Sequence, residues 1–183
     1  MSFATTWGTD PDERRLPFPC DTLIPGADAQ LFRGVTIEAA PDVVFRWLCQ
    51  LRAAPYSYDW IDNGGRQSPQ VLVPGLEQLK VGQEVMSIFK LTSFAPNKHL
   101  TIQNKPRGGG RTLFGDIAVS YLIVPRPDGK DSCRLLVKLV VRYSHSLKGR
   151  LMRNLLPFGD LVMMRRQLLN LKRLAEQTQI GST

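Results

Sequence analysis

The aromatic segment 56–60 carries side chains suited to acid/base chemistry and to ligand contact. The hydroxyl groups of Tyr56 and Tyr58 donate hydrogen bonds, and the carboxylate of Asp59 is a candidate general base if burial raises its pKa. Tyr56, Tyr58 and Asp59 are therefore the candidate catalytic residues, and Tyr56, Tyr58 and Trp60 the candidate ligand contacts here. Packing and helix capping are the alternative roles for the same side chains.

Two groups of basic residues are candidates to bind an anionic group of a ligand. Arg142 and His145, at the end of a predicted strand, are candidates to meet the anionic head group of a ligand, with exposure to solvent as the alternative. Segment 106–111 contains three glycines and two arginines, a composition that suits a phosphate cradle. We favour a flexible hairpin turn there, because no helix is predicted after it to reinforce anion binding.

The common catalytic and metal-binding patterns are missing from the sequence. His99 and His145 are the only histidines, and neither has the spacing of a metal site. No Gly-x-Ser-x-Gly turn is present. Cys20, Cys49 and Cys133 form no close pair and are expected to be small buried side chains. We therefore predict no metal ion and no cofactor.

Length and composition favour one globular domain. The chain has 183 residues, 43% hydrophobic and 22% charged. Its net charge of +8 is uneven: residues 1–62 carry five basic and nine acidic groups, and residues 63–183 carry nineteen and seven. The basic groups form no long run, so no nucleic-acid partner is expected. No segment is apolar enough to span a membrane, and the N-terminus resembles no signal peptide, so we expect a cytoplasmic protein.

The secondary-structure signals describe an α+β protein. Residues 1–30, rich in proline, are predicted to form an irregular arm held by Trp7, Phe18 and Leu23. A strand is predicted at 31–38, a helix at about 41–51, and a second short helix or ordered loop at 56–63. The segments 70–73, 84–95, 98–105, 111–125 and 132–144 then look extended and are separated by turn residues. Consecutive strands with short turns predict antiparallel hairpins.

The last predicted strand alternates in polarity. Arg134, Lys138 and Arg142 share one face, which predicts a sheet buried on one side only. The apolar residues of the other face are Leu135, Val137, Leu139, Val141 and Tyr143.

The C-terminal region is predicted to be helical from about 147, broken at 157–159, and resumed from Asp160 to about 177. At 100° per residue, one apolar stripe of the second part points toward the sheet. Its residues are Leu161, Met164, Leu168, Leu171 and Ala175.

Taken in order, several short segments resemble the START-like superfamily, also called SRPBCC or birch-pollen-allergen-like, and within it the bacterial polyketide cyclase/dehydrase-like branch. The resemblance covers most of the chain, with Cys20 standing where glycine would be expected before Asp21. The segments are Trp7-Gly8 with Glu13, Pro19-Cys20-Asp21, Ile37-Glu38-Ala39-Ala40-Pro41, Val44-Phe45-Arg46-Trp47-Leu48, Tyr56-Ser57-Tyr58-Asp59-Trp60, and Glu77-Gln78 with Val81-Gly82.

The resemblance implies a helix-grip fold, in which a curved antiparallel sheet wraps around a long C-terminal helix, with two short helices after the first strand. We therefore predict an irregular arm at 1–30 packed on the domain, a START-like helix-grip domain at 31–178 and a flexible tail at 179–183. Family members bind lipids, sterols, polyketides or other apolar small molecules, and some are enzymes. A sheet curved around one helix tends to leave an apolar pocket. Its expected lining is Leu135, Val137, Leu139, Val141, Tyr143, Met164, Leu168 and Leu171.

Three functional hypotheses follow. The first is a carrier or sensor of a hydrophobic small molecule or lipid. The second is a polyketide cyclase- or dehydratase-like enzyme that uses Tyr56, Tyr58 or Asp59 in the same cavity. The third is peripheral contact with an anionic membrane through the basic C-terminal region. The basic residues of that region are Lys148, Arg150, Arg153, Arg165, Arg166, Lys172 and Arg173.

Overall fold

The computed structural model describes residues 3–105, 115–127, 131–144 and 147–181, and omits the side chains of 147–152 and 154. His145, the glycines 108–110, and the side chains of Lys148 and Arg150 therefore lie outside the described part of the chain.

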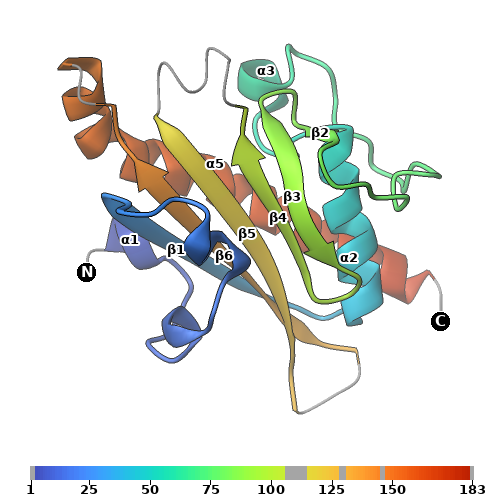
Figure 1. Ribbon diagram of the computed structural model, residues 1–183. Helices are drawn as coiled ribbons and strands as arrows, with labels where there is room; N and C mark the ends of the chain where they lie inside the picture. The colour runs from blue at the N-terminus through green and yellow to red at the C-terminus, as the bar shows by residue number, and fades with distance from the viewer. Residues whose placement is uncertain (1–2, 106–114, 128–130, 145–146, 182–183) are drawn as a thin grey trace.

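A six-stranded antiparallel sheet forms the centre of the molecule (Figure 1). Its strands are β1 (Ala29–Ile37), β2 (Glu84–Val85), β3 (Phe89–Ala95), β4 (His99–Asn104), β5 (Asp116–Pro125) and β6 (Cys133–Arg142). They lie in the order β1-β6-β5-β4-β3-β2, so the first and last strands of the chain are neighbours. In that pair Leu31 lies opposite Leu139, and Val35 lies opposite Leu135.

One long helix, α5 (Leu147–Ile180), lies against the inner face of the sheet, behind the strands in Figure 1. Between β1 and β2 lie α2 (Pro41–Cys49), the 3-10 turn η3 (Gln50–Arg52) and α3 (Asp59–Asp62). Proline stands at the first position of α2 and Asp42 in its first turn, where both favour helix initiation. This is the predicted helix-grip α+β fold. No helix within the described ranges is long and apolar enough to cross a membrane.

The inner core forms where the sheet meets α5 and α2. Alternate residues of β6 point inward, and Leu135, Val137 and Val141 are buried in one cluster with Leu168 and Leu171 of α5. Because side chains alternate between the two faces of a strand, the predicted apolar face of β6 is confirmed as the inner face.

The outer face of the sheet is also covered, so the expectation of a sheet buried on one side only is wrong. The N-terminal arm contains α1 (Phe3–Thr6) and the 3-10 turns η1 (Glu13–Arg15) and η2 (Pro19–Thr22). It crosses the outer side of β5 and β6, in front of the sheet in Figure 1. A second apolar cluster forms beneath it, from Phe18, Cys20, Ile24, Phe32, Ala118, Leu136 and Val140.

Lys138 illustrates how the arm buries a strand residue that the alternation predicts to be exposed. Its side chain is only 7% exposed, and its Nζ lies 2.5 Å from a carboxylate oxygen of Asp21. The ammonium also lies over the rings of Phe18 and Phe32, at 5.5 Å and 5.1 Å from the ring centroids. The ion pair and the two cation–π contacts replace the water that the charge loses.

The predicted helix break at 157–159 is also wrong, because α5 continues through Pro157. Proline removes one backbone hydrogen bond, since it has no N–H to donate to the carbonyl four residues earlier. The carbonyl of Pro157 accepts a hydrogen bond from Arg33 Nη2 at 3.3 Å, and the same guanidinium group binds Asp160. Contacts from β1 thus support the turn of α5 that contains the proline.

Two extended segments also differ from the prediction. Residues 70–73 form no strand; instead, the Gln50 side chain bonds both backbone groups of Val73. Segment 84–95 is divided into β2 and β3 because Met86 and Ser87 have φ angles of 47° and 58°. Positive φ does not fit a β ladder, so the chain turns there.

Candidate functional site

A buried ion pair lies inside the grip, between β1 and α5. Arg33, on the inner face of β1, is 1% exposed, and its Nη2 lies 2.7 Å from a carboxylate oxygen of Asp160. Its Nη1 donates to the carbonyl of Phe32 at 2.8 Å. Breaking such a pair on one side leaves a buried charge without compensation, so the two residues depend on each other.

Burial changes the protonation behaviour of this pair. It raises the pKa of Asp160 from its ordinary value of 3.8 to about 6, and the nearby Arg33 offsets only part of the rise. Burial likewise lowers the pKa of Arg33, against the attraction of Asp160. A carboxyl group with a pKa near 6 exchanges its proton close to neutral pH, as acid/base groups in enzymes do.

A buried amide links three elements next to this pair. Gln167 of α5 accepts a hydrogen bond from the Tyr121 hydroxyl at 2.8 Å and donates one to the carbonyl of Pro55 at 2.6 Å. Tyr121 lies on β5, so the amide joins the sheet, the helix and the segment after η3. Burial raises the pKa of Tyr121 above its usual range, so its hydroxyl stays protonated and donates the bond.

Tyr56 has a strained backbone and a buried side chain. Its φ of 57° lies in the left-handed region, which aromatic residues rarely adopt. Asn170 of α5 holds this conformation by donating to the Tyr56 carbonyl at 2.9 Å, and the ring packs edge-on against Trp47. Burial raises the pKa of Tyr56 to about 12, with a smaller contribution from Asp59. Strained residues of this kind cluster at functional sites.

Several buried polar atoms in the interior lack a partner. Among the described residues, no hydrogen-bond partner is present for the hydroxyl groups of Tyr56 and Tyr143 or for Nε of Arg33. Tyr143 continues the inner face of β6, and the guanidinium group of Arg153 lies 5.5 Å from its ring centroid. Burial raises the pKa of Tyr143, so its hydroxyl is a hydrogen-bond donor at neutral pH.

The predicted apolar lining lies on both sides of the interior. Leu135, Val137, Leu139 and Val141 point inward from β6 toward Leu168 and Leu171 of α5, in one continuous apolar cluster. Met164 is half-buried at its edge, together with Leu156, Met86 and Phe89. The structure thus brings this predicted set together, and its role in holding a ligand stays a prediction.

The aromatic segment 56–60 is divided among different environments. Asp59 accepts hydrogen bonds from the backbone N–H and the hydroxyl group of Ser68, at 2.8 Å and 2.5 Å, which engages both of its oxygens. Tyr58 is half-buried, with the guanidinium group of Arg166 at 5.9 Å from its ring centroid. Trp60 is 76% exposed on α3. Of the segment, only Tyr56 and Ser57 are buried.

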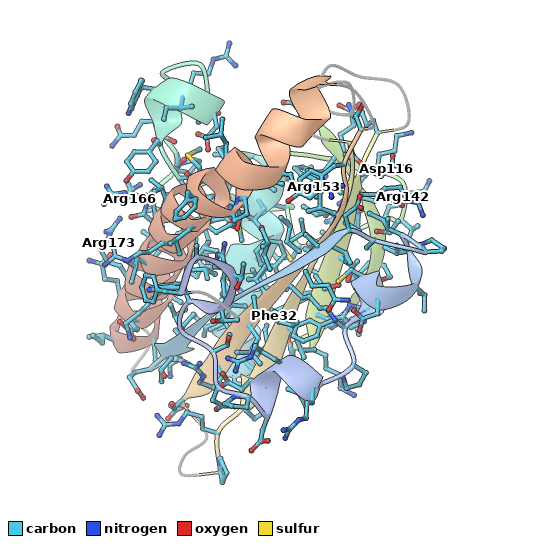
Figure 2. The ribbon with its side chains drawn as sticks, turned by 90° about the vertical axis from the view of Figure 1, so that its left-hand side faces the viewer. Phe32, Asp116, Arg142, Arg153, Arg166 and Arg173 are labelled. Atoms are coloured by element: carbon cyan, nitrogen blue, oxygen red, sulfur yellow. The ribbon has the colours of Figure 1, made fainter. Side chains whose placement is uncertain are left out.

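A separate groove lies on the opposite, outer face of the sheet and has a volume of about 380 Å³. The arm residues Leu23 and Ile24 form one wall, and the floor includes Gln103 of β4, Asp116 of β5 and Arg142 of β6. Figure 2 shows Asp116 and Arg142 near each other on this side. Arg142 therefore faces away from the interior, which does not fit its predicted contact with the head group of a ligand held there.

Four polar side chains of the interior could not be identified as site residues from the sequence: Arg33, Asp160, Tyr121 and Gln167. The sequence does indicate the direction of Arg33. It lies two residues before Val35 and four before Ile37 on the same strand, so its side chain points to the same face as theirs. The position of Asp160 after Pro157 and Gly159 predicts only a helix cap. Nothing in the sequence pairs these residues, because Arg33 and Asp160 are 127 positions apart.

Comparisons with known proteins show the fold. No protein-family model and no curated protein matches the chain. A crystal structure from Mesorhizobium loti is 16% identical, with 82% of this chain and 98% of that chain covered and a TM-score of 0.50. One from Chromobacterium violaceum is 13% identical, with 80% and 96% covered and a TM-score of 0.50.

A START superfamily protein from Mycobacterium smegmatis is also similar, at 17% identity, with 84% and 99% of the two chains covered and a TM-score of 0.48. The chain has the helix-grip α+β fold that the sequence resemblance implied. At these identities the likeness concerns the fold alone.

Proposed function

We propose that this protein is a carrier or sensor that binds a hydrophobic small molecule or lipid between the inner face of the sheet and α5. One observation carries the proposal: polar atoms of Arg33, Tyr56 and Tyr143 are buried in this interior and have no hydrogen-bond partner within the described part of the chain. Buried polar groups in proteins are nearly always hydrogen-bonded, and an unpartnered one requires an explanation. The polar group of a bound ligand supplies the partner.

The surroundings of these atoms suit a largely apolar ligand. The half-buried side chains of Met86, Phe89, Leu156 and Met164 pack against the apolar cluster to which Tyr143 belongs. Methionine side chains are flexible and adapt to varied apolar shapes. A ligand entering here would place its apolar body against these side chains and its oxygen atoms near the tyrosine hydroxyls and Arg33.

A cyclase- or dehydratase-like enzyme in the same interior is the alternative. Asp160 favours it, because a buried carboxyl group with a pKa of about 6 suits proton transfer. The candidate Asp59 favours it less, since Ser68 occupies both of its oxygens. Asp160→Asn and the double variant Tyr58→Phe/Asp59→Asn together separate the two functions, because both should retain ligand affinity in a carrier, and at least one of them should lose turnover in an enzyme that uses these groups.

Binding is tested with the uncharged fluorescent probe N-phenyl-1-naphthylamine. Leu139→Trp fills the interior and should weaken probe binding by about tenfold or more, equivalent to ~1.4 kcal/mol. Gln103→Trp is the matched control, because it places the same bulky side chain in the groove on the outer face. Loss of binding in Gln103→Trp with full binding in Leu139→Trp would transfer the site to the outer groove and overturn the proposal.

The natural ligand is identified by native mass spectrometry of the protein purified from its own host. A retained lipid or metabolite would appear as a defined mass increment, and Leu139→Trp should lose that increment. An increment that persists in Leu139→Trp and disappears in Gln103→Trp would contradict the interior site.

A further inference from the structure

The solvent-facing side of α5 carries an unusual mixture of apolar and basic side chains. Seven residues occur there between positions 155 and 173, and at 3.6 residues per turn they fall within a sector of about 100°. We call this set the outer stripe. Its members are Leu155, Phe158, Val162, Arg165, Arg166, Leu169 and Arg173.

The apolar members of the outer stripe lie open to water. Leu155 is 51% exposed, Phe158 is 64% exposed and Val162 is 53% exposed, while Leu169 is 37% exposed. Single exposed apolar residues are normal, whereas four on one helix face are a concentration of the kind found at interaction surfaces. The core of the protein explains none of them, since they lie on the side of α5 away from the sheet.

The three arginines of the outer stripe carry uncompensated charge. No carboxylate of the described residues lies within ion-pair distance of Arg165, Arg166 or Arg173. Figure 2 shows Arg166 and Arg173 on the outer side of α5, directed away from the sheet. The outer stripe itself contains no acidic residue. Its field is therefore positive along the whole face.

Aromatic side chains flank the stripe on neighbouring elements. The guanidinium group of Arg165 lies 5.7 Å from the ring centroid of Trp7, and that of Arg166 lies 5.9 Å from the ring centroid of Tyr58. Tyr58 directly precedes α3, where Trp60 is 76% exposed and Ile61 is 54% exposed. The residue that contacts Arg166 is thus followed directly by a short helix with an exposed indole ring.

We propose that the outer stripe docks on the surface of an anionic membrane, with α5 lying in the plane of the interface. Arginines attract anionic lipid headgroups, and leucine, phenylalanine and valine enter the boundary between headgroups and acyl chains. Tryptophan favours the same interfacial depth. A nucleic acid would use the arginines and leave the apolar residues in water, so charge and apolarity together favour the membrane.

This surface is distinct from the interior of the grip, and the proposal does not depend on an interior ligand. The two do fit together physically. A protein that lies on the membrane through α5 holds the interior, on the other side of the same helix, within one helix diameter of the headgroups. Probe binding in the interior and vesicle binding by the outer stripe are measured separately, so either proposal can fail alone.

The test is co-sedimentation with vesicles of phosphatidylcholine alone and of phosphatidylcholine mixed with phosphatidylglycerol, at low and at high salt. We expect binding to the anionic vesicles only, and weaker binding at high salt. Arg166→Glu/Arg173→Glu should reduce that binding by about a hundredfold or more. Arg15→Glu/Arg46→Glu, with the same change in net charge at exposed positions elsewhere, should retain it.

The contribution of the apolar residues to vesicle binding is tested by a matched pair of valine variants. Val162 and Val81 are similarly exposed, at 53% and 58%, but only Val162 lies in the outer stripe. Val162→Asp should lose most of the vesicle binding, and Val81→Asp should retain it. Thermal unfolding of each variant checks that it folds, which is expected for surface positions.

Three results would overturn the proposal. The first is an absence of salt-sensitive binding to anionic vesicles by the natural protein. The second is equal loss of binding in both double arginine variants, which would show a response to net charge alone. The third is a dimer in light scattering that Val162→Asp dissociates, which would make a second copy of the chain the occupant of the outer stripe.

Discussion

Replacing Asp160 by asparagine should change how the stability of the protein depends on pH. The natural side chain has a pKa of about 6 in the folded state and an ordinary value of 3.8. A difference of about two units corresponds to about 3 kcal/mol, at 1.36 kcal/mol per unit. The side chain is 9% exposed, so solvent screens this contribution little.

The direction in which the free energy of unfolding changes with pH follows from which state binds the Asp160 proton. Between pH 4 and pH 6 the folded protein holds the Asp160 proton and the unfolded chain has released it. The free energy of unfolding of the natural protein therefore falls as the pH rises through this window, and the full loss is present above pH 6. Asparagine does not titrate, so Asp160→Asn lacks this loss.

The measurement is urea unfolding of both proteins from about pH 3.5 to 7, followed by tryptophan fluorescence. Relative to Asp160→Asn, the natural protein should lose about 3 kcal/mol across the window. In Arg33→Met the loss should start at the same pH but extend to higher pH and become larger, because the charge and hydrogen bond that lower the folded-state pKa of Asp160 are gone. The reasoning would be refuted if the free energy of unfolding had the same pH dependence in the natural protein and in Asp160→Asn. It would also be refuted if the natural protein gained stability, relative to Asp160→Asn, as the pH rises.

Three further changes test other contacts by urea unfolding. Gln167→Leu should cost about 2 kcal/mol by leaving the buried Tyr121 hydroxyl unpaired, and an unchanged stability would contradict that role. Gly8→Ala should lower the free energy of unfolding by well above ~2 kcal/mol, because its φ is 73° and the new Cβ would lie 2.1 Å from a carbonyl oxygen of β1. Gly75 has a similar φ of 85° but open space around it, so Gly75→Ala should lower the free energy of unfolding by only ~1–2 kcal/mol. Equal losses in the two variants would exclude the clash at Gly8. Phe18→Ala should cost about 3 kcal/mol, and a loss below ~1 kcal/mol would show that the arm does not stabilise the sheet.

The sequence predicts those parts of the fold that follow from the periodic spacing of apolar residues along a strand or a helix. The inner positions of β6 are apolar at every second residue, and Leu168 and Leu171 recur at helical spacing, so periodicity assigns them to facing surfaces. The order of elements then indicates a sheet and one long helix. The arm is also anticipated in part, because Phe18 had to be buried on the body of the protein.

Other features depend on contacts between distant segments and could not be predicted. Alternation on β6 places Lys138 in water, and only the position of the arm shows that Asp21 and two phenylalanine rings cover it. Likewise, proline predicts a break in α5, and only the contacts of Arg33 on β1 account for the intact helix. The polar cluster of the interior has the same origin, since it joins residues from β1, β5 and α5.

The location of a bound ligand is the most direct test of the proposed function. Methyl NMR of the protein titrated with N-phenyl-1-naphthylamine reports each face of the sheet separately. The account predicts that the methyl signals of Leu139, Leu168 and Met164, inside the grip, shift on probe binding, while those of Leu23 and Leu136 on the outer side do not. Shifts confined to Leu23 and Leu136 would contradict it and place the ligand in the outer groove.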